Sequence, residues 1–278
     1  DPRDLVSKYE FKHLIDGVLL PGEKMREILL KNNKIFPSQA YMTGYPTFDW
    51  ALPELRKYFL SCEEFCKKNN IHAENKIILF VSGFSAADMD MSKWETMYSH
   101  SPESLTKERS RTFSEDARDM RLKSISYIKT VLDRHPTWRL IVRKHPFEDD
   151  RIYRDAFGNN PQVVFPRAHT DIYDLLSVSD AVLHWNSTVS VQAWGLQKPT
   201  VLFDSGKPFF FDAEGTASQK GNYICRDERQ LESALNEIFS GKPIPEAQLQ
   251  ARKAFIDKWF MGMDGKSASR IAGTVVGF

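Results

Sequence analysis

The sequence predicts an α/β protein built on a doubly wound parallel sheet. From Lys76 onward, short apolar runs end in small or polar residues, as in KIILFVSG, WRLIVRKHP and KPTVLFD. Such runs are typical of strands that are buried on both faces of a parallel sheet. The helical stretches TDIYDLLSVSD and STVSVQAWGLQ stand between such runs. Strands that alternate with helices favour right-handed crossovers and a parallel sheet.

The first part of the chain contains the elements of a second, incomplete α/β unit. Residues 15–31 combine the strand IDGVLLPG with the helix EKMREILLK, and QAYMTG supplies another short strand. A helix is predicted over about 53–69, where the polar run KKNN ends it. Because these strands are too few for a complete sheet, we expect residues 1–73 to be the end of an N-terminal domain with its linker and residues 74–278 to form a C-terminal domain.

The C-terminal part supplies the remaining elements. Residues 84–113 are polar and mixed in composition, which predicts a functional loop. Ser114 is the expected N-cap of a helix that ends near Arg134. Further strands are predicted at QVVFP and AVLHWN, and further helices at DERQLESALNEIFSG and over about 246–260.

Composition and charge argue against several classes of protein. Hydrophobic residues make up 41% of the 278 residues and charged residues 27%, as in ordinary globular proteins. The formal net charge of +1 gives no reason to expect nucleic acid as a partner. The sequence contains no signal peptide and no apolar run long enough to span a bilayer. Because the chain begins with DPRDLVSKYE and lacks an initiator methionine, we expect a piece of a longer protein.

The three cysteines predict neither a disulfide nor a metal site. Cys62 and Cys66 lie one turn apart on a predicted helix, where pairing is geometrically poor. Buried thiols in a reducing compartment are therefore expected. A metal site would need more ligands nearby, and none is evident in the sequence.

The stretch VRKHPFED, residues 142–149, ends an apolar strand with a histidine, a proline and two acids. Proline cannot continue a ladder, so the strand is predicted to stop at His145. The carboxyl ends of parallel strands are where such sheets bind ligands. A lone histidine is usually structural, but Lys144 beside His145 favours contact with a phosphate or a base. Glu148 and Asp149 are alternatively acids at a helix start.

A second candidate stretch is WNSTVSVQA, where Asn186, Ser187 and Thr188 stand between a strand and a helix. Hydroxyl groups and free backbone N–H groups at that position bind phosphate, although simple N-capping is the alternative. We expect the candidate ligand-binding side chains to gather at one edge of the sheet: Ser82, Gly83, Lys144, His145, Pro146, Glu148, Arg167, Asn186, Ser187 and Thr188. The common dinucleotide, P-loop, zinc-protease and nucleophile-elbow motifs are absent from the sequence.

Four stretches resemble the C-terminal half of a GT-B glycosyltransferase of the capsule and surface polysaccharide type. They are MTGYPTFD (42–49), RKHPFED (143–149), TDIYDLLSVSDAVLHWNSTVSVQAWGLQKPTVLFD (170–204) and DGKSASRIA (264–272). The pairing of a His-Pro motif with a Ser-Thr motif is similar to that of transferases that use CMP-activated acidic sugars, the sialyltransferases and the 3-deoxy-manno-octulosonic acid (Kdo) transferases. It also looks partly like the CDP-glycerol polymerases of teichoic acid synthesis.

The resemblance implies a GT-B-like, Rossmann-like nucleotide-sugar domain with the remnant of an N-terminal α/β domain, towards which the last long helix crosses back. It implies a glycosyltransferase that moves a Kdo-like sugar from a CMP-sugar donor to a polysaccharide or glycolipid acceptor, as in capsule or lipopolysaccharide biosynthesis. His145 and Pro146 would frame the cytidine phosphate, and Ser187 and Thr188 would bind the phosphate. The first alternative is a CDP-glycerol-type glycerophosphotransferase, and the second is a non-catalytic module that binds a polysaccharide or a partner protein. The expected location is cytoplasmic, with association at the inner membrane face as a further expectation.

The chemistry is expected to need neither a cofactor nor a metal. Lysine, histidine, arginine and helix amides can neutralise a leaving phosphate, and a CMP leaving group needs fewer of them than a diphosphate. Asp88-Met89-Asp90 has the spelling of a metal-binding D-x-D motif but lies within a loop. Sugar transfer needs a general base or a carboxylate nucleophile, and Asp88, Asp90 and Asp116 are the predicted candidates. For each of them a solvated acid in a loop or at a helix start is the alternative, and retention or inversion is left open.

Overall fold

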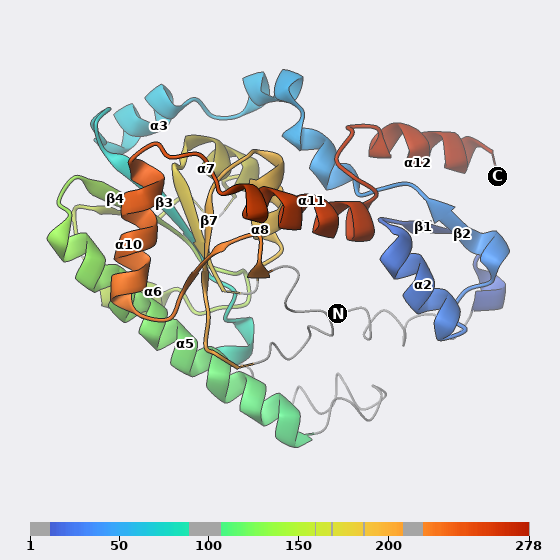
Figure 1. The fold of residues 1–278 in the computed structure, drawn as a ribbon, viewed down its shortest axis with the longest axis horizontal. Helices are drawn as coiled ribbons and strands as arrows, with labels where there is room; N and C mark the ends of the chain where they lie inside the picture. Colours follow the sequence, from blue (N-terminus) through green and yellow to red (C-terminus); the bar gives the residue numbers. More distant parts are fainter. Residues whose placement is uncertain are drawn as a thin grey trace.

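The computed structural model describes residues 12–88, 107–158, 160–167, 169–185, 187–207 and 219–277, with the side chains of 107–110 excepted. Its main body is a six-stranded parallel sheet in the order β5-β4-β3-β6-β7-β8 (Figure 1). The strands are β3 (Lys76–Val81), β4 (Trp138–Arg143), β5 (Val163–Val164), β6 (Ala181–His184), β7 (Thr200–Phe203) and β8 (Tyr223–Cys225). The chain winds outwards from β3 to β5 on one side and from β6 to β8 on the other, so the predicted doubly wound sheet is confirmed.

Helices cover both faces of this sheet, because successive residues of each strand point to opposite faces. Phe80, Leu140 and Leu183 face α5 (Lys107–Arg134), α6 (Arg151–Phe157) and α10 (Glu228–Phe239). Their chain neighbours Leu79, Ile141 and Val182 face α3 (Cys62–Asn69), α7 (Ile172–Val178) and α8 (Val189–Gly195). Each fully buried side chain of this size stabilises the fold by about 1.5–3 kcal/mol, which explains why near-continuous apolar runs form the sheet.

Three of these helices begin at residues whose side chains satisfy a free backbone N–H group. Ser61 accepts a hydrogen bond from the N–H of Glu64 at α3, over 3.2 Å. Asp171 and Asp227 do the same at α7 and α10, over 2.7 and 2.8 Å. Such caps are each worth about 1 kcal/mol, so short polar residues before apolar runs set these boundaries.

Two predicted helix boundaries are wrong. Helix α5 begins at Lys107, so Ser114 is an interior, buried residue and not an N-cap. The helix predicted over 53–69 is two 3-10 segments, η3 (Pro46–Ala51) and η4 (Pro53–Tyr58), followed by α3. Prolines open both segments, and the extended backbone of Phe59 separates the second from α3. Helix η5 (Ser85–Asp88) also lies within the predicted loop.

A smaller part of the structure contains a two-stranded parallel sheet of β1 (Val18–Leu20) and β2 (Ala40–Met42) with α2 (Glu23–Lys31), close to the predicted elements. The 3-10 segments η1 (Lys12–Leu14) and η2 (Pro37–Gln39) complete it. Its core is small: Val18, Leu20, Leu29 and Ile35. The division into two domains at residue 73 stays a prediction.

Helix α11 (Glu246–Phe260) spans from the large sheet to the smaller part (Figure 1). Near its middle, the buried Arg252 donates to the carbonyl oxygens of Gly221 and Lys198, over 2.8 and 3.1 Å. Burial lowers the pKa of Arg252 to about 10. At its end, Trp259 lies against Gly22, where an added Cβ would stand 2.3 Å from the Trp259 carbonyl carbon. The helix is therefore anchored in both parts.

Two of the stretches that carry the family resemblance meet at α12 (Ser267–Val276). The carboxylate of Asp49 accepts hydrogen bonds from the backbone N–H groups of Ser267 and Ala268, over 3.2 and 2.8 Å. Gly44 has a φ of +81°, and a Cβ there would stand 2.6 Å from the Ser267 hydroxyl. MTGYPTFD therefore contains the cap of the helix that DGKSASRIA begins.

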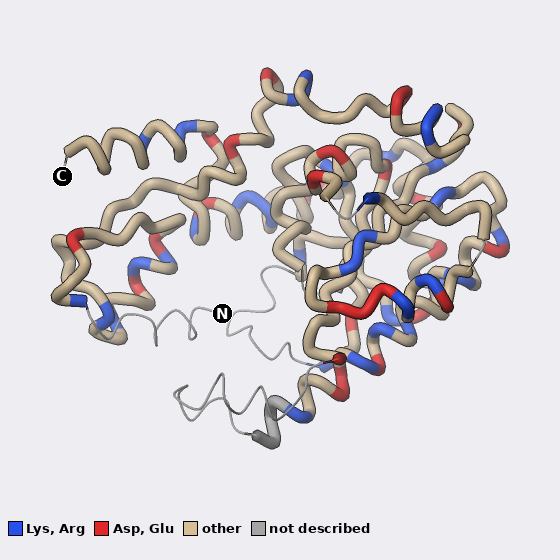
Figure 2. The backbone as a smooth tube through the Cα atoms, turned by 180° about the vertical axis from the view of Figure 1, so that it is seen from behind, with Lys and Arg blue, Asp and Glu red and all other residues tan. Residues whose placement is uncertain are grey.

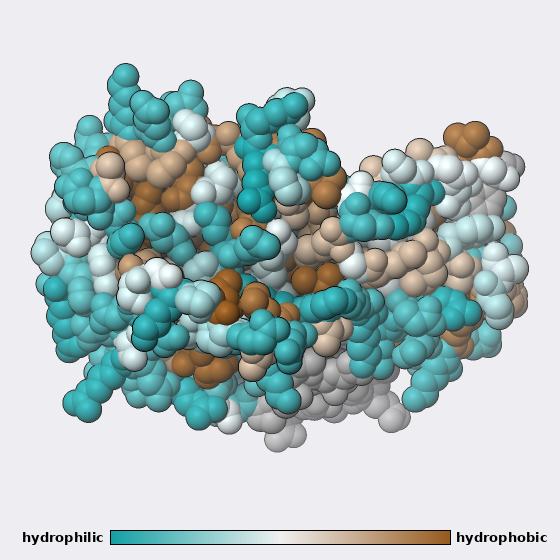
Figure 3. Space-filling model, turned by 45° about the horizontal axis from the view of Figure 1, so that its top comes forward, coloured by the Kyte–Doolittle hydropathy of each residue, from teal (hydrophilic) through white to brown (hydrophobic). Residues whose placement is uncertain are grey.

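Charged residues of both signs are interspersed along the chain, with no long segment of one sign in the described part (Figure 2). The face in Figure 3 is mostly hydrophilic, and its hydrophobic residues form separate patches. Within the described residues, no helix combines the length and apolar character needed to cross a bilayer.

Candidate functional site

The carboxyl ends of β3, β4 and β6 bring most of the predicted donor-binding residues to one edge of the sheet. Strands β3 and β6 are neighbours, and the order of the strands reverses between them. In doubly wound sheets, the crevice at this point is where ligands bind. Ser82 and Gly83 follow β3, Lys144 to Pro146 follow β4, and Ser187 and Thr188 follow β6. Asn186 and Asp90 lie outside the described residues.

The loop after β4 fixes the orientation of His145. Its backbone N–H donates to Ser82 Oγ over 2.8 Å, so the loop is tied to the end of β3. Its Nδ1 accepts a hydrogen bond from the backbone N–H of Phe147 over 3.3 Å. In the neutral ring, the proton is then on Nε2, which can donate to an anionic oxygen. Phe147 itself is 83% exposed.

Glu148 lies beneath this loop and is only 4% exposed. Its Oε1 accepts from the Ser82 hydroxyl over 3.1 Å and from the Phe84 N–H over 2.8 Å, and its Oε2 accepts from the Tyr153 hydroxyl. Burial, and then the nearby Glu148 carboxylate, raise the pKa of Tyr153. Both carboxylate oxygens of Glu148 thus accept hydrogen bonds from the protein itself. This favours a role in positioning the loop over the predicted contact with the sugar donor.

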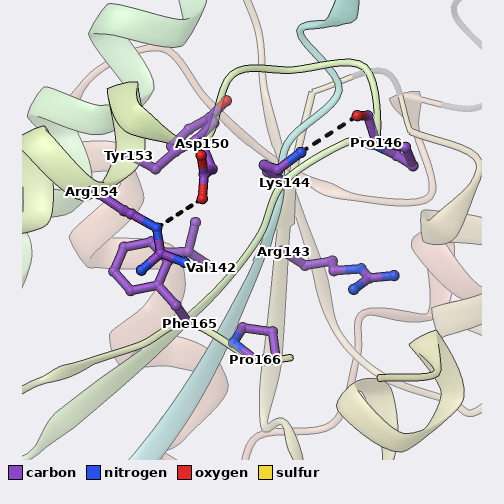
Figure 4. Close-up of a pocket in the computed structure, with 9 residues that line it drawn as sticks. All are labelled: Val142, Arg143, Lys144, Pro146, Asp150, Tyr153, Arg154, Phe165 and Pro166. Carbon is purple, nitrogen blue, oxygen red and sulfur yellow. Dashed lines mark hydrogen bonds and ion pairs between the residues drawn. The ribbon is translucent and has the colours of Figure 1, made fainter. Parts of the chain in front are cut away.

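A cavity of about 310 Å³ opens beside the β4 tip (Figure 4). It is lined by Val142, Arg143, Lys144, Pro146, Asp150, Tyr153, Arg154, Phe165 and Pro166. The guanidinium carbon of Arg154 stands 4.8 Å from the centre of the Phe165 ring. Arg154 Nε also donates to Asp150 Oδ2 over 2.8 Å, and this bond lowers the pKa of Asp150. The cavity therefore has one cation, Arg154, over an aromatic ring. Two further basic residues, Arg143 and Lys144, belong to its lining, and Lys144 Nζ donates to the Glu148 carbonyl oxygen over 2.9 Å. Basic groups beside an aromatic ring suit a nucleotide.

The Ser187–Thr188 segment after β6 shows features both of helix N-capping and of a phosphate-binding segment. Ser187 Oγ accepts from the Val189 N–H over 3.3 Å, as a helix-starting serine does. Thr188 makes no side-chain capping bond at α8, so its hydroxyl remains available to a ligand. Arg167, in the loop after β5, is exposed.

Asp88 and Asp116, two of the predicted catalytic carboxylates, each form an ion pair with a basic side chain. Asp88 Oδ1 accepts from Nη2 of the buried Arg121 over 2.7 Å, and its Oδ2 from Nη1. This pair joins η5 to α5. Asp116 pairs with Lys207, which follows β7. Among the described residues, no group of three or more His, Cys, Asp or Glu side chains could hold a metal ion.

Comparison with solved structures identifies the same fold in other proteins. The wall teichoic acid polymerase TagF is 16% identical, with a TM-score of 0.61, over 94% of this chain and 57% of TagF. The S. aureus MnaA–UDP structure is 15% identical, with a TM-score of 0.55, over 95% of this chain and 61% of MnaA. A putative UDP-N-acetylglucosamine 2-epimerase from Listeria monocytogenes is 16% identical, with a TM-score of 0.54, over 92% and 57%. The chain thus spans little more than half of these proteins, and the likeness confirms the GT-B-like α/β fold.

No curated protein sequence matches the chain. The sequence model of the CDP-glycerol:poly(glycerophosphate) glycerophosphotransferase family matches residues 9–277. This match supports the transferase class and favours the CDP-glycerol alternative over the CMP-linked acidic sugar. The capsule and lipopolysaccharide expectations gain no support from it. Because the match extends over nearly its whole length, the chain belongs to the CDP-glycerol:poly(glycerophosphate) glycerophosphotransferase family.

Proposed function

We propose that this chain binds the donor in an enzyme that transfers glycerol phosphate from CDP-glycerol to a growing polymer. The family match over residues 9–277 is the observation that carries this proposal. In such a transfer, an acceptor hydroxyl oxygen forms a bond to the phosphorus that carries the glycerol. The bond between that phosphorus and the bridging oxygen breaks, CMP leaves, and the hydroxyl proton passes to a base.

This chemistry removes one argument for a CMP-sugar donor. A CDP leaving group would carry a diphosphate and would need more positive charge than CMP. When glycerol phosphate is transferred, the leaving group is CMP, as it is for a CMP-sugar. The basic groups at the β4 tip are therefore matched to the leaving group of either donor.

The geometry of the β4 tip supports a role for each basic group. In the proposed complex, Lys144 and Arg143 lie beside the diphosphate, and the Nε2–H of His145 donates to a phosphate oxygen. Charge-assisted hydrogen bonds of this kind are roughly twice as strong as neutral ones. Arg154 and Phe165 offer a flat surface to the cytosine ring, and the Asp150 carboxylate can accept from its amino group. The Ser187–Thr188 segment would face the same diphosphate from β6.

Calorimetric binding of CDP-glycerol and transfer of labelled glycerol phosphate to a poly(glycerol phosphate) primer test the proposal. We expect CDP-glycerol to bind, CMP to be released, and His145→Ala to lower transfer by about 10²-fold, the scale expected when one hydrogen-bond donor to the reacting phosphate is lost. The matched control is His72→Ala, an exposed histidine before β3 at the opposite edge of the sheet. Product from CMP-Kdo alone, or equal transfer by the two variants, would contradict the proposal.

A further inference from the structure

A second cavity, of about 530 Å³, lies between the segment 46–59 and the helices α7 and α8. It shares no lining residue with the cavity at the β4 tip. Its aromatic side chains are Trp50, Tyr58, Phe59 and Tyr173. One side of the cavity is thus formed by residues 46–59, and the other by residues 171–174 and 192, more than a hundred positions further along the chain.

The floor of this cavity is held by contacts that need no ligand. The ring of Phe59 stacks on Tyr173, with centres 5.6 Å apart and an interplanar angle of 21°. The Tyr173 hydroxyl donates to the Thr47 carbonyl oxygen over 2.6 Å. Asp174 Oδ1 accepts from the Leu60 N–H over 2.8 Å. Because these bonds cross between distant segments, the cavity is preformed, which lowers the entropic cost of binding.

Two large aromatic side chains at this cavity remain open to water. Trp50 is 46% exposed and Tyr58 is 66% exposed, although rings of this size usually bury most of their surface. Exposed aromatic groups beside a cavity are typical of a surface that a ligand covers.

The polar groups of the cavity identify the chemistry of that ligand. Asp171 and Asp174 each use Oδ1 to accept a backbone N–H, and within the described residues each Oδ2 accepts none. These oxygens and the amide of Gln192 can bind hydroxyl groups. No Lys or Arg stands among the residues that line the cavity. A phosphate would therefore be repelled by two carboxylates, and Lys57, which lies over the Tyr58 ring, would offset only part of their charge.

Aromatic rings with carboxylates also attract organic cations. Here, however, Lys57 Nζ stands 5.1 Å from the centre of the Tyr58 ring, so a cation already lies over that ring. A second cation beside it would be repelled. The combination favours an uncharged molecule with apolar C–H faces and several hydroxyl groups.

We infer that this cavity binds an uncharged saccharide unit that the acceptor carries in addition to its glycerol phosphate units, with sugar rings against Trp50 and Tyr58 and hydroxyl groups on Asp171 and Asp174. The acceptor role rests on the proposed function, whereas saccharide binding does not. The cavity volume of about 530 Å³ lies within the range of roughly 300–1,000 Å³ that is usual for small-molecule sites.

Binding is tested with cellobiose and N,N′-diacetylchitobiose as probes, by saturation-transfer NMR and tryptophan fluorescence. We expect at least one disaccharide to bind and Trp50→Ala and Tyr58→Ala to weaken it about tenfold or more. Trp50→Phe, which keeps a ring, should retain most of the affinity. The control is Leu122→Ala, an exposed apolar residue on α5.

The same titrations with choline and glycerol 3-phosphate separate the rival ligands. The inference is overturned if neither disaccharide binds, if Trp50→Ala binds as tightly as the parent, or if choline or glycerol 3-phosphate binds more tightly. CDP-glycerol is titrated in parallel. If a saccharide binds and CDP-glycerol does not, the proposed function is refuted and the saccharide site is supported. If CDP-glycerol binds and no saccharide binds, the saccharide site alone is refuted.

Discussion

Replacing Tyr153 by phenylalanine removes one hydroxyl from the buried cluster that joins the tips of β3 and β4. Tyr153 is fully buried on α6, and its hydroxyl donates to the Glu148 carboxylate. Because the ring stays in place, the substitution leaves little new space, and the cavity term in the free energy of unfolding is small. What changes is that Oε2 of Glu148 loses its donor.

The magnitude follows from the burial of both partners. A hydrogen bond to a charged group is worth about 1.5–3 kcal/mol, and a buried acceptor without a partner adds to the loss. We therefore expect Tyr153→Phe to lower the free energy of unfolding by about 2 kcal/mol. Tyr127→Phe is the matched control, since the Tyr127 hydroxyl donates to the Arg226 carbonyl oxygen over 3.0 Å at the surface. Its loss should cost about 0.5 kcal/mol.

Urea unfolding followed by circular dichroism measures both variants against the parent chain. The Tyr153 variant should shift the midpoint several times further than the Tyr127 variant, with an unchanged m-value. It should also weaken CDP-glycerol binding, because Glu148 and Ser82 hold the His145 loop. A Tyr153 variant as stable as the Tyr127 variant would refute the view that Glu148 is a buried, charged anchor.

Three further predictions concern pH, base recognition and catalysis. Burial lowers the pKa of His184 from 6.5 to about 4, so the unfolded chain takes up a proton there before the folded chain does. The free energy of unfolding should therefore fall by about 3 kcal/mol as the pH falls from 6.5 to 4, and His184→Gln should reduce this loss in an acid unfolding experiment. Asp150→Ala should lower the preference for CMP over UMP about fivefold in calorimetric titrations. Asp149→Ala should leave this preference unchanged, because the Asp149 carboxylate pairs with Arg151, outside the cavity. Among Asn variants of the predicted catalytic carboxylates, Asp88 and Asp116 included, at least one should bind CDP-glycerol normally and transfer about 10²-fold more slowly, and normal transfer by all of them would place the base elsewhere in the enzyme.

Much of the sheet could be predicted because its strands are local signals. The run from Ile77 to Val81 is apolar and is followed by a serine and a glycine, so the length and the end of β3 are visible in the sequence. The position of the His145 loop could be predicted for the same reason. Strand β8 could not, because only three residues form it and only Cys225 is fully buried.

Other features depend on pairs of residues far apart in the chain. The sequence suggested a donor contact for Glu148 because this residue follows the carboxyl end of a predicted strand. Its burial depends on Ser82, which is 66 positions away. Helix α5 begins earlier than predicted because its charged first turns carry no signal that separates a helix from a polar loop. The cavity at Trp50 was missed because its walls meet only in the folded chain.

Helix α11 has a consequence for how the molecule can move. Its fifteen residues form a rod about 22 Å long. Arg252 binds this rod to the large part through hydrogen bonds, and the backbone of Trp259 packs against Gly22 of the smaller part. Moving the two parts away from each other would have to break the buried hydrogen bonds of Arg252 or separate the close contact between Trp259 and Gly22. The rod therefore acts as a spacer of constant length between the two parts.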